Sequence, residues 1–121
     1  MEDYLIKIGN VKLKYILRSG YDIKENQEIV LAEATMADGT KRRNIAEKRR
    51  TFIKIKFSQI DGKTLQDYNN LWQNDFEATY WSKDDRVYKT ATFRVENKPT
   101  NSVLYTKKEI YDEFEVEMET V

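Results

Sequence analysis

The sequence predicts a mainly β, α+β fold: an antiparallel β-barrel or sandwich with one flanking α-helix (about 64–74) and a long basic hairpin arm (about 37–50). Two observations predict it. Apolar residues alternate with polar ones along most of the chain, and one segment instead repeats them at spacings near 3.6. The chain has 121 residues, of which 40% are apolar and 12% aromatic, enough for one core. We therefore expect a single domain over residues 1–121.

The C-terminal segment alternates most clearly. Phe114, Val116 and Met118 fall on one parity, with Ile110 before them. The other parity is acidic and consists of Glu113, Glu115, Glu117 and Glu119. Because successive side chains of a strand point to opposite faces, we expect one packed face and one carboxylate ladder.

Residues 51–57 repeat this alternation with the opposite charge. Ile53, Ile55 and Phe57 are expected to face the core, and Lys54 and Lys56 the other side. If this strand pairs with the C-terminal one, lysines lie opposite glutamates, and each such pair contributes roughly 0.2–1 kcal/mol. The pairing is a hypothesis that strands in different sheets would contradict.

Further strands are expected at 3–8, 11–17, 28–36, 76–82 and 86–96. Asp38-Gly39 suits a tight turn, since Gly accepts a positive φ. The stretch from Ala37 to Arg49 then forms the tip of a long hairpin, with few apolar residues to pack on a core.

The segment between Gly62 and Asp75 has the period of a helix. Leu65, Tyr68, Leu71 and Trp72 recur at spacings near 3.6, which predicts a core-facing stripe. Thr64 followed by Asp67 resembles a capping box that starts the helix, with Asp in place of the usual Glu or Gln.

Charge is unevenly distributed, although 21 Lys and Arg balance 21 Asp and Glu. Six of the ten residues 41–50 are basic, and no basic residue follows Lys108. Three interpretations stay open: oppositely charged segments within one solvated fold, complementary patches that attract neighbouring copies or partners, and nucleic-acid binding through the basic run.

Composition also limits the chemistry. The chain has neither Cys nor His, which excludes disulfides, thiolate and imidazole catalysis, and the usual zinc sites. Asp84-Asp85 is expected to be a turn, and no Gly-rich phosphate loop occurs. We expect no catalytic residue, cofactor or metal, and hence no enzyme. No apolar run is long enough to span a membrane, and the acidic start is unlike a signal peptide, so synthesis in a cytosol is expected.

Single-stranded nucleic-acid binding by a small β-barrel is the alternative. It would combine the basic 41–50 segment with exposed aromatic side chains on which bases stack. Phe52 shares the parity of Lys54 and is a candidate, and Tyr80, Trp81 and Tyr88 are others. Zero net charge weakens this interpretation, and we do not expect nucleic acid as the partner.

The order of motifs over residues 28–121 resembles a family of small tail-module proteins of long-tailed bacteriophages and prophages. The resemblance rests on ADGTKR at 37–42, IAEKRR at 45–50, the strand ending at Phe57, a helix with Leu65 and Leu71-Trp72, FEATY at 76–80, YKTATFRV at 88–95 and FEV at 114–116. It implies a structural subunit of a phage tail or baseplate, made in the bacterial cytoplasm and located in the virion. Its partners would be copies of itself, in a ring or other homo-oligomer, and other tail proteins.

The resemblance also implies a role for the uneven charge distribution in contacts between subunits. A ring subunit needs two different surfaces that meet head to tail, and a basic arm against an acidic strand face would supply them. The expected interface residues are Lys41, Arg42, Arg43, Lys48, Arg49 and Arg50 on one side, and Glu113, Glu115, Glu117 and Glu119 on the other.

Overall fold

The computed structural model describes residues 3–35, 37, 39, 41–45, 49–96, 103–105 and 109–121. One helix and twelve strands are assigned within them. Their bounds are β1 Ile6–Ile8, β2 Val11–Lys12, β3 Ile16–Gln27, β4 Val30–Thr35, β5 Lys41–Ile45, β6 Arg50–Phe57, β7 Ile60–Asp61, α1 Gly62–Leu71, β8 Phe76–Ser82, β9 Val87–Arg94, β10 Val103–Tyr105, β11 Ile110–Tyr111 and β12 Phe114–Thr120.

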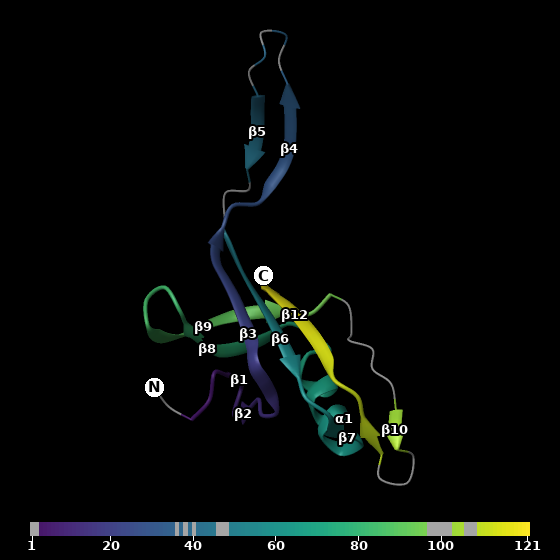
Figure 1. The fold of residues 1–121 in the computed structure, drawn as a ribbon. Helices are drawn as coiled ribbons and strands as arrows, with labels where there is room; N and C mark the ends of the chain where they lie inside the picture. The colour runs from purple at the N-terminus through teal and green to yellow at the C-terminus, as the bar shows by residue number, and fades with distance from the viewer. Residues whose placement is uncertain are drawn as a thin grey trace.

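Seven strands form the main sheet, in the order β2-β1-β8-β9-β12-β6-β3 (Figure 1). Every neighbouring pair in it is antiparallel. A smaller sheet has the order β10-β11-β7, and β4 and β5 form a separate two-stranded ribbon. The mainly β architecture with one helix is therefore as predicted.

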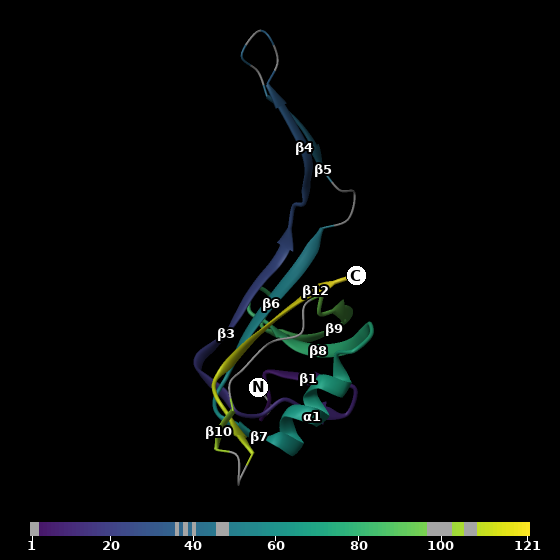
Figure 2. The same ribbon diagram turned by 90° about the vertical axis from the view of Figure 1, so that its right-hand side faces the viewer.

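The main sheet is open, so the choice between barrel and sandwich is settled for a sandwich-like arrangement. Its two edges are β2 and β3, and no ladder joins them among the described strands. The helix α1 lies to one side of the sheet, near β1 and the β7 end of the molecule (Figure 2).

The predicted pairing of the two alternating strands is confirmed. β6 and β12 are adjacent, with Val116 opposite Ile55, Glu115 opposite Lys56 and Glu117 opposite Lys54. The apolar members of both strands are buried, with Ile55 and Phe57 fully inaccessible. The period-two pattern thus gives the correct face of each strand.

An aromatic cluster fastens α1 to these central strands. Phe57 and Phe114 are cross-strand partners whose rings stack at 5.0 Å between centroids. Tyr68 and Trp72 from the helix segment lie 5.6 and 6.4 Å from the Phe57 ring. The predicted helical stripe therefore packs in the core, with Leu65 buried and Leu71 partly buried beside it.

The predicted start of the helix is wrong by two residues. α1 begins at Gly62, and Asp61 is its N-cap: its carboxylate Oδ1 accepts the Thr64 backbone N–H at 3.0 Å. Thr64 is thus the third helical residue rather than the cap. The helix ends at Leu71 rather than near residue 74, with Trp72 as C-cap.

The sequence analysis misses most of β3, because only Ile16 and Leu17 of this strand fall within an expected strand (11–17). β3 is a 12-residue edge strand with two register shifts against β6, between Ile16 and Tyr21 and between Lys24 and Gln27. Gly20 lies in the first shift, where a Cβ atom would come within 2.7 Å of the Lys56 carbonyl oxygen. Such bulges interrupt the alternation on which the expectation relied.

A hairpin arm is present, as predicted, but its two strands β4 and β5 span residues 30–45 rather than about 37–50, and Arg50 already belongs to β6. The ribbon continues the β3–β6 pair and projects from the sheet (Figures 1 and 2). Its register places Ala34 opposite Arg42 and Thr35 opposite Lys41. Gly39 has a φ of +88°, as the predicted turn requires. Residues 38, 40 and 46–48 of the predicted arm lie outside the described part of the chain.

Phe57→Ala should unfold the protein far more readily than Phe52→Ala. Phe57 is at the centre of the aromatic cluster, and truncating a buried Phe costs about 3–5 kcal/mol. Phe52, on the opposite face of the same strand, is only half-buried. Chemical denaturation of both variants measures the difference, and equal losses would contradict the assignment of faces.

The N-cap of α1 makes a pH-dependent contribution. Hydrogen bonds from the Thr64 side chain and backbone hold the pKa of Asp61 below its usual range. A lowered carboxyl pKa stabilises the folded state above the unfolded value, and this contribution is lost as pH falls through the folded value. Asp61→Ala should lower the Tm at neutral pH, whereas Asp61→Asn should keep the cap but lose this acid sensitivity. Thermal unfolding at neutral pH and at about pH 3 tests both variants; an unchanged Tm in Asp61→Ala would exclude the cap.

Candidate assembly interface

The acidic ladder of β12 is partly neutralised within the chain. Lys54 Nζ lies 3.0 Å from Glu115 Oε1 and 3.1 Å from Glu117 Oε1, so one lysine forms ion pairs with two glutamates of β12. These hydrogen bonds raise the pKa of Lys54. Because all three side chains are well exposed, each pair contributes little stability.

Glu119 has the least exposed side chain among the glutamates of β12. Its side chain is 17% exposed and contacts two arginines, Arg50 at 3.4 Å and Arg94 at 3.3 Å. Arg94 also pairs with Glu96 at 3.1 Å. Arg50 and Glu119 were expected on opposite sides of an interface between copies, and here they meet within one chain.

The remaining predicted interface residues are more scattered. Glu113 is exposed and precedes β12. Lys41, Arg42 and Arg43 form the first part of β5 on the arm. Lys48 lies outside the described residues. A single chain brings none of these together, so their meeting between copies stays a prediction.

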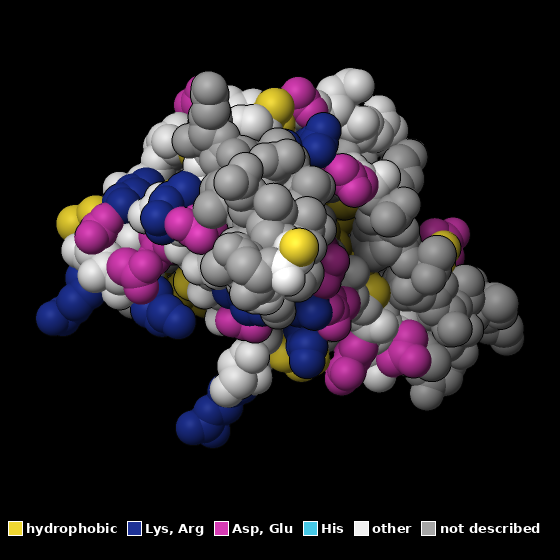
Figure 3. Space-filling model, turned by 90° about the horizontal axis from the view of Figure 1, so that it is seen from above, with side chains coloured by type: hydrophobic (Ala, Val, Ile, Leu, Met, Phe, Trp, Pro, Cys, Tyr) yellow, Lys and Arg dark blue, Asp and Glu magenta, His cyan; other side chains and the backbone are white. Residues whose placement is uncertain are grey.

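The visible described surface mixes both charges. Figure 3, seen from the end at which the arm projects, shows Lys and Arg side chains interspersed with Asp and Glu. The interpretation of opposite charges meeting within one fold therefore holds for β6 and β12. It does not account for the cations of β5.

The arm is joined to the body by a group of side-chain contacts. Arg49 Nη1 donates to the Asn26 carbonyl oxygen at 3.1 Å, and Arg49 Nη2 pairs with Glu28 Oε1 at 3.2 Å. Asn26 has a φ of +51°, at the second register shift of β3. The Thr51 hydroxyl accepts the Asn26 N–H at 3.4 Å. The chain therefore leaves the main sheet at a β-bulge of β3 that these side-chain contacts hold in place.

Glu25, next to this bulge, is a buried carboxylate that sequence reasoning missed. It is 7% exposed and accepts the Ser82 hydroxyl at 2.6 Å and the Asp84 N–H at 2.9 Å. Tyr21, also on β3, donates its hydroxyl to the Trp81 carbonyl at 2.9 Å. These contacts tie edge strand β3 to the end of β8 and the following turn, which includes the predicted Asp84-Asp85 turn.

The buried Glu25 affects its neighbours. Burial, and then the Glu25 charge, raise the pKa of Tyr21 well above its usual range. The same two causes raise the pKa of Tyr80. Both phenols therefore stay protonated at neutral pH.

The aromatic residues considered for base stacking are largely engaged. Tyr80 is buried, and Trp81 contacts Tyr88 edge-to-face at 5.0 Å. Tyr88 also packs on Tyr4 at 4.7 Å and donates to the Tyr4 carbonyl at 2.7 Å. Phe52 faces the carboxylates of β12. This placement gives the nucleic-acid alternative no support.

Within the described residues, no group of three His, Cys, Asp or Glu side chains is arranged to hold a metal ion. The described part of the chain also holds no helix with the length and apolar character needed to cross a membrane.

The architecture is sandwich-like, with an open antiparallel main sheet, one packed helix and a projecting two-stranded arm. The chain belongs to the family of unknown function DUF6711, which matches residues 1–119. No curated protein matches it. Among solved structures, it is similar to a chain from the tail of an empty GTA (gene transfer agent) particle with C6 symmetry. The TM-score is 0.52 at 14% identity, over 98% of this chain and 91% of that one, which shows a shared fold.

Glu25→Gln should lower the stability of the protein by about 1.5–3 kcal/mol, because the amide oxygen can accept only one of the two hydrogen bonds and the NH2 group then faces a donor in a buried site. Glu28→Gln is the matched control, because Glu28 is 46% exposed. We expect a change within about 0.5 kcal/mol for this control. Urea denaturation gives both values; a Glu25→Gln variant as stable as the control would show that the buried junction contributes nothing.

Proposed function

We propose that this chain is a non-enzymatic structural subunit of a phage-like tail, assembling with copies of itself and with other tail proteins. The observation that carries the proposal is the fold shared over 98% of the chain with a protein of a tail that has C6 symmetry. The resemblance of residues 28–121 to small tail-module proteins points the same way. A place in the tail or baseplate of a virion follows from this proposal.

Two features of the fold suit a ring. Each end of the main sheet is an edge strand, β2 or β3, with backbone groups able to pair with another strand. The arm extends beyond the body that packs the core (Figure 1). An arm on one side and a receiving face on the other form a heterologous contact, which closes into a ring when the rotation between subunits allows.

Reversing arm charges should block assembly and leave the subunit folded. We choose Lys41→Glu with Arg42→Glu, because their cross-strand neighbours are the uncharged Thr35 and Ala34. Arg49 and Arg50 are less suitable, since both make ion pairs within the chain. The matched control is Lys63→Glu with Lys83→Glu, an equal charge change at two exposed positions of the body.

Electron microscopy of particles from strains that carry each variant counts intact tails, and circular dichroism of the purified chains checks folding. For the arm variant we expect the number of intact tails to fall at least tenfold, which corresponds to a loss of about 1.4 kcal/mol per contact. For the control variant we expect no such fall. Normal tail numbers in the arm variant would show that these arm cations are dispensable for assembly.

A further inference from the structure

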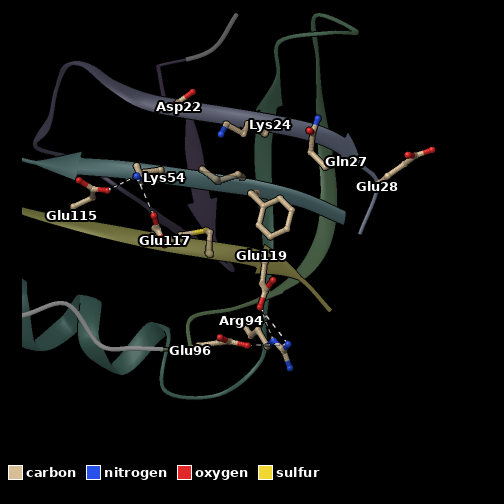
Figure 4. A pocket seen from close by; sticks show the side chains of 13 residues that line it. Asp22, Lys24, Gln27, Glu28, Lys54, Arg94, Glu96, Glu115, Glu117 and Glu119 are labelled. Atoms are coloured by element: carbon tan, nitrogen blue, oxygen red, sulfur yellow. Dashed lines mark hydrogen bonds and ion pairs between the residues drawn. The ribbon is translucent and has the colours of Figure 1, made fainter. Parts of the chain in front are cut away.

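A groove runs over the outer face of β3, β6 and β12, below the base of the arm (Figure 4). Its volume is about 860 Å³. Six acidic and three basic side chains line it. The acidic ones are Asp22, Glu28, Glu96, Glu115, Glu117 and Glu119, and the basic ones are Lys24, Lys54 and Arg94.

The groove has an aromatic side chain between charged ones. The strand register places Lys24, Phe52, Glu119 and Arg94 in one row across β3, β6, β12 and β9. Phe52 is half-buried and lines the groove. A flat aromatic face next to carboxylates is a good seat for an arginine guanidinium, which stacks on the ring and hydrogen-bonds to the acid.

The arm carries the complementary charge. Residues 30–45, which span the β4–β5 ribbon, contain three Lys and Arg against two Asp and Glu, an excess of one cation. The groove lining has an excess of three anions, two of which, Glu28 and Glu119, are paired with Arg49 and Arg50 of the same chain. On β5, Arg43 lies opposite Glu33, whereas Lys41 and Arg42 lie opposite uncharged residues. Lys41 and Arg42 therefore have no acidic residue directly opposite them on β4.

We infer that this groove receives the β4–β5 arm of a second copy of the chain, with an arm arginine over Phe52 and a second arm cation facing Glu117, whose side chain is 72% exposed. In both ribbon views the arm of the same chain extends beyond the ends of β3, β6 and β12, the strands that carry the groove, so the occupant is another copy (Figures 1 and 2). The inference rests on the proposed function and specifies its contact. It also narrows the predicted acidic surface, because Glu113 does not line the groove.

Two charge reversals, one in β12 and one at the residue just before it, test the groove. Glu117 lines it and its side chain is 72% exposed, so Glu117→Lys should fold; Lys54 still has Glu115 as a partner. Glu113→Lys makes the same charge change outside the groove. We expect incorporation into particles to fall at least about tenfold for Glu117→Lys, because like charges then face each other, and to stay within about twofold for Glu113→Lys.

A photo-crosslinking amino acid at position 52 of the full chain identifies the occupant directly. In assembled particles, a crosslink from position 52 to residues 30–50 of another copy supports the inference. If the wild-type chain is incorporated but position 52 crosslinks elsewhere, to another protein or to nothing, the groove assignment is overturned and the tail role stands. If the wild-type chain is absent from intact tailed particles, the proposed function fails first, and the groove inference fails with it.

Discussion

The alternation of β6 and β12 is the constraint on which the rest of the fold depends. Ile53, Ile55 and Phe57 on one strand, and Phe114, Val116 and Met118 on the other, fill one side of the sheet. A shift of either strand by one residue would move its apolar set to the charged side. Lys54, held between two glutamates of β12, opposes such a shift from the outer face. Core and surface thus select the same register.

The second constraint lies where the arm leaves the body. β3 loses its regular register against β6 there, and Thr51 and Arg49 bind the backbone of Asn26 in place of the missing ladder. Glu25 adds a buried hydrogen bond from Ser82 of β8. Burying the Glu25 carboxylate is costly unless its oxygens are paired, and both accept a hydrogen bond from β8 or the turn after it. The arm therefore starts from a fixed point even though few apolar residues lie along it.

Much of this arrangement was predictable from sequence, for a physical reason. Where one strand face is buried, the period of two is strong, so the faces of Phe57 and Phe114 and the Lys–Glu pairing followed from alternation. The turn at Gly39 and the core stripe through Tyr68 followed from equally local rules.

The rest depends on contacts distant in sequence. Glu25 lies in a polar stretch, and only the approach of Ser82, 57 positions later, makes it a buried acceptor. The bulges of β3 hide its length, and Asp61 rather than Thr64 caps α1 because the hydrogen-bonding geometry, not the motif alone, selects the cap. The groove around Phe52 needs four strands in register, so the parity of Phe52 indicates its side of β6 but not its neighbours.

The account of function joins a fold found in a sixfold tail to a charged arm and a groove of opposite charge. Its central claim is that the chain is a tail component, and quantitative mass spectrometry of purified tailed particles from the source tests this most directly. We expect this polypeptide at a fixed stoichiometry of several copies per particle. Its absence from intact particles, while it is abundant in the producing cells, would contradict a structural role and leave only a shared fold.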